Sequence, residues 1–258
     1  MPSPISSQTV LSSFEACSSD ERTLIQLLSV MFAPSSKNVL LNIARRNGNP
    51  GPGGRPYTGL VVADSLEKLS HQNLVQLSKD GVRCSPQIMH AATLSAVREG
   101  VFEAMAGTVQ QEIPMVTDWG SSYYRSSLHA LRDVRIGCYK RDAKYALEMV
   151  SRYQRQFPYE TLRCHPLITA CNTPFDTAWF RSLPEPLAFA ALKEILAQAS
   201  VELSPSVAPF ELFCEMASGR ALTQEIVDLF CKELLLRGRL NEAQQVAREA
   251  VSSTELAV

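Results

Sequence analysis

The chain lacks a strong excess of either charge, and it lacks long apolar runs. Its 258 residues carry 25 Lys and Arg against 26 Asp and Glu, a net charge of −1, which argues against a histone-like grip on nucleic acid. No run reaches the roughly 18 apolar residues of a membrane span. Residues 1–13 have no basic start followed by an apolar stretch, so we expect no secretory signal. Seven cysteines without a framework spacing fit free thiols in a reducing compartment. The sequence therefore predicts a cytoplasmic protein without membrane contact.

Motifs for catalysis and cofactor binding are also missing. There is no Gly-x-Ser-x-Gly elbow and no His-Glu-x-x-His helix. The glycine- and proline-rich stretch 49–56 has no Gly-Lys-Ser or Gly-Lys-Thr after it and no strand before it, so it is not a phosphate-binding loop. Cys164, His165 and Cys171 lack the paired spacing of structural zinc sites, and buried apolar thiols are the alternative. We therefore expect no enzymatic activity, no metal and no cofactor.

What the chain does have is the periodicity of short helices. An apolar fraction of 45% with 20% charged residues is typical of a folded protein, and the length suits two domains. Three stretches near the amino terminus start after residues that can cap a helix, at Ser19 or Asp20, at Ser36 and at Thr58. Their apolar residues recur at three- and four-residue spacing, which places them on one buried face of each helix. These residues are Leu24, Leu27, Leu28, Met31, Val39, Leu40, Ile43, Val62, Leu66 and Leu69.

Residues 73–84, directly after the third helix, have the pattern of a β-hairpin. Asn73–Leu77 and Val82–Cys84 favour strands, and Asp80-Gly81 favours the tight turn between them. Three helices followed by a hairpin is the element order of a winged helix. The expected fold class is mainly α, with an amino-terminal winged helix (three helices plus a β-hairpin) followed by an irregular α-helical solenoid. We assign residues 1–18 to a flexible segment, 19–95 to the winged helix and 96–258 to a helical-repeat domain.

A winged helix of this kind contacts either DNA or a protein, and the sequence leaves both possibilities open. If it binds DNA, the third helix enters the major groove and basic side chains hold phosphates. The candidate nucleic-acid-binding residues are Lys37, Arg45, Arg46, Arg55, Ser65, Lys68, Lys79 and Arg83. Against this, the third helix also exposes Asp64 and offers no outward Arg, Asn or Gln for base edges. The alternative is packing on a protein partner, or on the rest of the chain, through Leu60 and Val61.

From Pro86 onward, helical stripes continue almost to the end of the chain, and we expect no further hairpin. The expected helices start near Pro86, Ser122, Asp142, Phe175, Glu185, Ala208, Thr223 and Asn241. The residues Gly238, Leu240, Ala243, Ala247 and Ala250 have the small-residue spacing of the second helix of a tetratricopeptide repeat. The segment 118–125 brings together Trp119, Tyr123 and Tyr124, which we assign to partner binding, either as a surface anchor or as a buried anchor between domains.

The order of a winged helix followed by degenerate helical repeats resembles the amino-terminal region of large bacterial Swi2/Snf2-type helicase-like proteins. It is also similar to the helical arms of large bacterial signalling ATPases and transcription regulators. Either resemblance implies a recognition or regulatory arm on a nucleotide-driven engine whose motifs are not in this sequence, and we expect the chain to be the amino-terminal piece of a longer protein. The leading hypothesis is thus a non-enzymatic recognition module for a protein partner or a carboxy-terminal motor domain. The alternative is a DNA-binding transcription regulator with a helical dimerisation or sensing domain.

Overall fold

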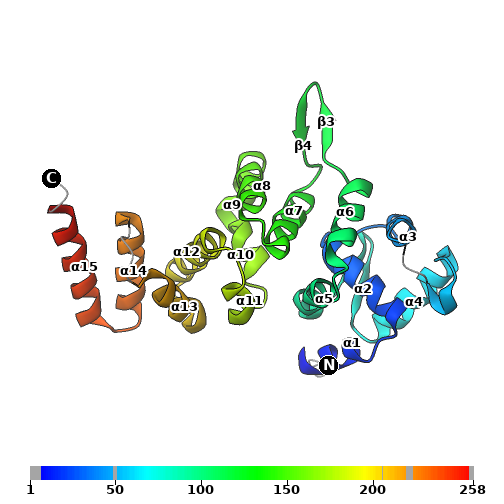
Figure 1. Ribbon diagram of the computed structural model, residues 1–258, viewed down its shortest axis with the longest axis horizontal. Helices are drawn as coiled ribbons and strands as arrows, with labels where there is room; N and C mark the ends of the chain where they lie inside the picture. The colour runs from blue at the N-terminus through cyan, green and yellow to red at the C-terminus, as the bar shows by residue number, and fades with distance from the viewer. Residues whose placement is uncertain (1–6, 49–50, 205, 219–222, 256–258) are drawn as a thin grey trace. The chain divides into compact units, whose positions relative to one another are not determined.

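The computed structural model describes residues 7–48, 51–204, 206–218 and 223–255. The expected mainly α class is confirmed, because 71% of the structure is helical and the described residues form 15 helices and two small antiparallel hairpins. The chain divides into two compact units, Met1–Lys140 and Arg141–Val258 (Figure 1). We describe each unit by itself.

The first unit begins with a helix that the sequence analysis did not expect. Helix α1 spans Ser7–Glu15 and packs against α5 (Pro86–Arg98), with Val10 and Phe14 buried. The prediction of a flexible segment over residues 1–18 is therefore wrong for this helix, while residues 1–6 lie outside the described part of the chain. The reason is that Val10 and Phe14, four positions apart, place one apolar face in an otherwise polar segment.

Three helices and a hairpin follow in the expected order. They are α2 (Ser19–Met31), α3 (Lys37–Arg46), α4 (Gly59–His71), β1 (Val75–Ser78) and β2 (Gly81–Cys84). The first helix is capped one residue earlier than expected, since the Glu21 carboxylate accepts a hydrogen bond from the backbone N–H of Ser18. Ser36 and Thr58 cap α3 and α4 as predicted, each accepting from a backbone N–H three residues later.

The apolar faces predicted for these helices form the core of the unit. Leu24, Leu28, Leu40, Leu66 and Leu69 are all fully buried. The remaining predicted core residues, Leu27, Met31, Ile43 and Val62, are buried as well, and only Val39 is half-buried.

The turn of the first hairpin requires glycine for a specific steric reason. Strands β1 and β2 pair antiparallel with Ser78 opposite Gly81, and Val82 also forms a bridge with Ser35 ahead of α3. Gly81 has φ +125°, and a Cβ atom there would lie 2.5 Å from the backbone oxygen of Ser35. Only glycine both adopts this conformation and permits the close approach.

The first unit continues beyond the predicted boundary at residues 95/96, which falls inside α5. Helix α2 packs against α5, α6 (Phe102–Glu112) and α7 (Ser127–Lys140). Between α6 and α7 the chain forms a second hairpin, β3 (Val116–Asp118) and β4 (Ser121–Tyr123). We expected a helix from Ser122 and no hairpin here, so that prediction is wrong. The strands are only three residues long and the turn is Trp-Gly instead of Asn-Gly, so the usual hairpin pattern is missing.

The second unit consists of helices packed around α12. These are α8 (Ala143–Gln156), α9 (Pro158–Arg163), α10 (Pro166–Cys171), α11 (Thr177–Arg181), α12 (Glu185–Val201), α13 (Val207–Ala217), α14 (Gln224–Leu236) and α15 (Leu240–Glu255). Helix α12 contacts α8, α10, α13 and α14. The starts of α8 and of α11 to α15 lie near the predicted positions, whereas α9 and α10 were not predicted.

The tetratricopeptide-like spacing is only partly reflected in the α14–α15 pair. Ala243 is buried, and its carbonyl accepts a hydrogen bond from the thiol of Cys231 at 3.6 Å. Leu240 and Ala247, by contrast, are exposed, and the Ala250 side chain lies outside the described part. Among the residues of the pattern whose side chains are described, Ala243 is therefore the one buried against α14, where the repeat pattern predicted a row of them.

Buried charge holds α12, α13 and α14 together. The Glu233 side chain is fully buried, accepts a hydrogen bond from Ser200 Oγ at 2.6 Å and forms an ion pair with Arg237. Arg237 also donates to the carbonyl of Ser206 at 2.7 Å and lies 3.9 Å above the ring of Phe210. The charges are thus paired and hydrogen-bonded, as burial requires.

Candidate protein-interaction site

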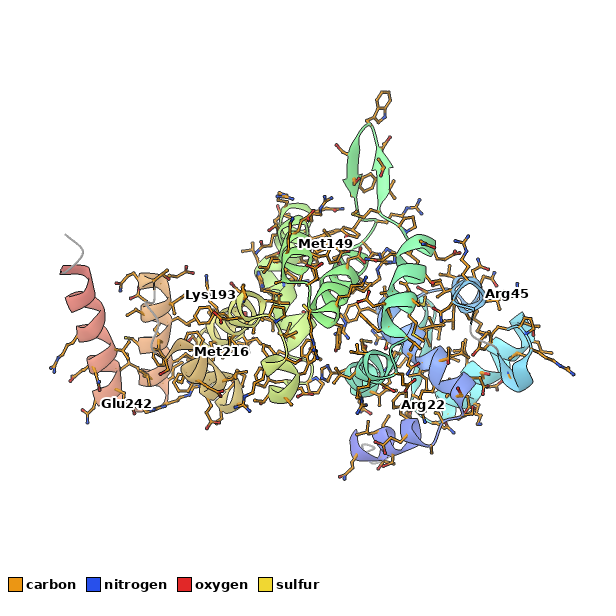
Figure 2. The ribbon with its side chains drawn as sticks, viewed as in Figure 1. Arg22, Arg45, Met149, Lys193, Met216 and Glu242 are labelled. Atoms are coloured by element: carbon orange, nitrogen blue, oxygen red, sulfur yellow. The ribbon has the colours of Figure 1, made fainter. Side chains whose placement is uncertain are left out.

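Half of the predicted nucleic-acid-binding residues are engaged within the chain. Arg45 Nε donates to the carbonyl of Tyr57 at 2.8 Å and so holds the loop ahead of α4 (Figure 2). Arg46 forms an ion pair with Glu112 of α6 at 3.3 Å. Since these guanidinium groups hold other parts of the first unit, they are less available for phosphate contacts.

Lys68 and Arg83 are also engaged in contacts within the first unit. Lys68 Nζ lies 2.6 Å from the Glu21 carboxylate. Hydrogen bonds from Lys68 and Ser18 lower the pKa of Glu21, although burial alone would raise it. Arg83 Nε donates to Gln76 Oε1 across the β1–β2 hairpin at 2.8 Å. Ser65 is half-buried, which leaves Lys37, Arg55 and Lys79 as exposed cations whose side chains have no ion-pair partner among the described residues.

The outer face of α4 is acidic. Leu60, Asp64, Glu67 and His71 are exposed at positions that share one face of the helix. Leu60 is 72% exposed, as expected for a contact residue, whereas Val61 is half-buried. Two outward carboxylates on a helix repel phosphate, so this face is better suited to a protein surface than to a DNA groove.

The most exposed large apolar side chain of the described residues lies at the tip of the β3–β4 hairpin. Trp119 is 99% exposed. It occupies the turn with φ +47°, followed by Gly120 with φ +78°. A bulky residue rarely adopts a positive φ, and such backbone strain persists where the surroundings impose it. Asp118 precedes Trp119 and is exposed, and Tyr123 is 42% exposed.

The sides of this hairpin are polar but carry little charge. Thr117 and Ser122 face each other across the strands with their hydroxyl oxygens 3.2 Å apart, and Val116 pairs with Tyr123. Figure 1 shows the hairpin projecting from α6 and α7. Trp119 is thus displayed away from the helices that support it.

Both ends of the hairpin are held by one pair of buried charges on α7. Arg132 and Asp133 are 1% and 4% exposed and form an ion pair at 2.8 Å. Arg132 donates to the carbonyl of Ile113, just before β3, at 2.9 Å. The hydroxyl of Tyr124, just after β4, donates to the other oxygen of Asp133 at 2.8 Å. The two segments that enter and leave the hairpin are therefore fixed to the same point of the helix.

This network places Tyr124 differently from the prediction. Tyr124 is 4% exposed, so it supports the hairpin from below and is not a contact residue. Arg132 and Asp133 were not identified from the sequence, although the apolar stretch around them, residues 130–139, is buried throughout. Two adjacent charges inside such a stretch are the signal that could have found them, because charges are almost never fully buried unless paired.

The cysteine and histidine residues considered for zinc make local contacts within the chain. Cys164 Sγ lies 3.4 Å from Thr169 Oγ1, and His165 Nδ1 accepts the backbone N–H of Leu167 as the cap of α10. Burial lowers the pKa of His165, with the nearby Lys193 adding to this and Glu194 opposing it. Within the described residues no three His, Cys, Asp or Glu side chains are grouped so that they could hold a metal ion.

No helix in the described ranges has both the length and the apolar character needed to cross a bilayer. No protein-family model matches the chain, and neither a curated protein nor a solved structure matches it.

Proposed function

We propose that this chain is a non-enzymatic recognition module that binds a protein partner through the tip of the β3–β4 hairpin. The observation that carries the proposal is Trp119, fully exposed on a hairpin whose two ends are fixed by the buried Arg132–Asp133 pair. Tryptophan is enriched among the residues that dominate protein interfaces, because one rigid side chain buries a large apolar area. Fixing its position before binding reduces the entropy lost on association.

The same proposal includes the finer description of the fold. The order from α2 to β2 is that of a winged helix, and the helices of the second unit would form an irregular α-solenoid. The acidic outer face of α4, with Leu60 at its start, supports a second protein contact. In this interpretation the chain is a recognition arm of a larger, ATP-driven nucleic-acid-processing assembly, as its resemblance to helicase-like proteins suggests.

A DNA-binding regulator is the competing function, and the exposed cations Lys37, Arg55 and Lys79 are the observation in its favour. The salt dependence of binding distinguishes the two functions. DNA binding predicts an affinity for a short duplex that falls steeply between about 50 and 200 mM salt and weakens when Lys79 is neutralised. The protein-binding proposal expects no such salt-dependent complex.

The proposal is tested by quantitative affinity capture from a lysate of the source cells. The full chain is compared with Trp119→Ala and with a matched control, Leu162→Ala, which truncates a side chain 85% exposed in the second unit. We expect a protein that wild type and Leu162→Ala retain equally and that Trp119→Ala loses by at least tenfold. Equal retention by all three proteins would contradict the proposal.

A further inference from the structure

The first unit contains a pocket on the side where α1 packs on α5, and Arg22 of α2 also lines it. Its volume is about 330 Å³. An apolar cavity of about 150 Å³ can accept benzene, so this pocket is large enough for one two-ring aromatic side chain. It is lined by Leu11, Phe14, Glu15, Arg22, Ala91, Ser95, Arg98 and Glu99.

One polar atom of the residues that line this pocket has no hydrogen-bond acceptor in the described part of the chain. The terminal nitrogen of Arg22 donates to the carbonyls of Glu15 and Cys17 at 3.0 and 3.4 Å. Its Nε atom is buried and has no hydrogen-bond acceptor among the described residues; Figure 2 shows Arg22 on α2. A buried donor without an acceptor is destabilising.

The other polar groups define what such a ligand must carry. Glu99 already accepts hydrogen bonds from Ser95 Oγ at 2.6 Å and Gln26 Nε2 at 3.0 Å. These bonds lower the pKa of Glu99, although burial alone would raise it. Arg98 is exposed at the pocket and offers a guanidinium. The apolar side chains with Arg98 therefore suit an aromatic ring that lies next to a carboxylate.

The β3–β4 tip presents this combination, since Asp118 immediately precedes Trp119 and both are exposed. We propose that the tip of one copy of the chain docks into the α1–α2–α5 pocket of a second copy. The indole packs on Leu11, next to Phe14, and the Asp118 carboxylate pairs with Arg98. This inference rests on the proposed function, because it names a partner for the same tryptophan.

The contact joins two copies and does not form within one. The tip and the pocket belong to the same compact unit, and Figure 1 shows the hairpin projecting on the side of that unit away from α1. Because the two surfaces differ, each docked copy still offers a free tip and a free pocket, so association proceeds head to tail. The contact area is small, and small interfaces are weak and transient. Association is therefore expected only at high protein concentration.

The test is sedimentation of the full chain over about 1 to 500 µM, the range that separates micromolar from submillimolar association. Wild type should show a weight-average mass that rises with concentration. Trp119→Ala should weaken association at least tenfold, and Leu162→Ala, the exposed control in the second unit, should leave it unchanged. A wild type that stays monomeric throughout, or a self-association that Trp119→Ala leaves intact, overturns the inference.

A mixing experiment tests the head-to-tail geometry. Trp119→Ala keeps its pocket but lacks the tip, whereas Leu11→Arg keeps the tip and fills the rim of the pocket with a charge. Each variant alone should be monomeric, and an equimolar mixture should form one-to-one pairs and nothing larger. Circular dichroism confirms that both variants are folded, and a mixture that remains monomeric while wild type associates overturns the inference.

The charge contact is tested by reversal. Asp118→Arg and Arg98→Asp should each weaken association, and the double variant should regain it, whereas a double variant as weak as the single ones overturns the assigned contact. Failure of the second-copy inference is distinguishable from failure of the proposed function. If wild type stays monomeric, but Trp119→Ala still loses a protein that wild type captures from the lysate, only the identification of the partner as a second copy is refuted.

Discussion

Replacing Asp133 with alanine removes the acceptor that both Arg132 and Tyr124 use at the base of the β3–β4 hairpin. The Arg132 guanidinium, 1% exposed, then stays buried without its carboxylate. Breaking a buried ion pair from one side costs about 3–5 kcal/mol, so we expect the free energy of unfolding of the first unit to fall by that amount. Tyr124→Phe removes one hydrogen bond to a charged acceptor and should cost about 1.5–3 kcal/mol.

The assay combines urea denaturation, followed by circular dichroism, with hydrogen exchange of the amides in residues 116–123. The matched control is Glu103→Gln. It removes the ion pair between Glu103 of α6 and Lys140, which lies on α7 as Asp133 does. Glu103 is 68% exposed, and an exposed pair contributes about 1 kcal/mol or less. If Asp133→Ala costs no more than this control, or if the hairpin amides exchange at the wild-type rate, the assignment of Arg132 and Asp133 as the support of the hairpin is wrong.

Three further predictions concern stability. Gly81→Ala should destabilise the first unit by about 2–4 kcal/mol, because the positive φ disfavours alanine and its Cβ would contact the oxygen of Ser35 at 2.5 Å; thermal and urea unfolding measure the loss. Glu233→Ala should destabilise the second unit by about 3–5 kcal/mol in urea unfolding, because Arg237 loses its buried partner. Glu21 has a lowered pKa in the folded state, so the unfolded chain binds more protons than the folded chain as the pH falls below the ordinary glutamate pKa of 4.5. Its contribution to stability is present above that pH and is lost as the pH falls through the folded pKa, so Glu21→Gln should flatten the acid limb of a stability–pH curve.

Each of these has a matched control. Gly48 also has a positive φ but no atom within 4 Å of an added Cβ, so Gly48→Ala should cost less than Gly81→Ala, and equal costs would refute the steric argument. Glu242→Gln removes an exposed ion pair to Arg239 and should destabilise the second unit far less than Glu233→Ala does. Glu148→Gln, on an exposed helix face, should leave the acid limb unchanged.

The part of the fold that the sequence predicts best is the part that local signals specify. The helices from Ser19, Lys37 and Gly59 carry a cap and an apolar face, and Asp80-Gly81 marks the first turn. The helix at Ser7–Glu15 was missed because its serines resemble a loose terminus, while Val10 and Phe14 make it fold only through their contact with α5. Tertiary burial outweighs local propensity in such a segment.

The candidate site is predictable in the same limited way. Its aromatic composition identified Trp119 and Tyr123, but nothing local distinguishes an exposed Trp119 from a buried one. The roles of Arg46 and Lys68 depend on Glu112 and Glu21, which are distant in sequence and close only in the folded unit. Pairing of this kind follows from tertiary structure and not from spacing along the chain.

The anchoring of Ile113 and Tyr124 to a single place on α7 has a practical consequence for protein engineering. Residues 114–123 lie between two fixed posts, so their sequence can be exchanged or lengthened without redesigning the helices beneath. A foreign peptide grafted between those posts would have both of its ends held by α7 and would be presented in a constrained form.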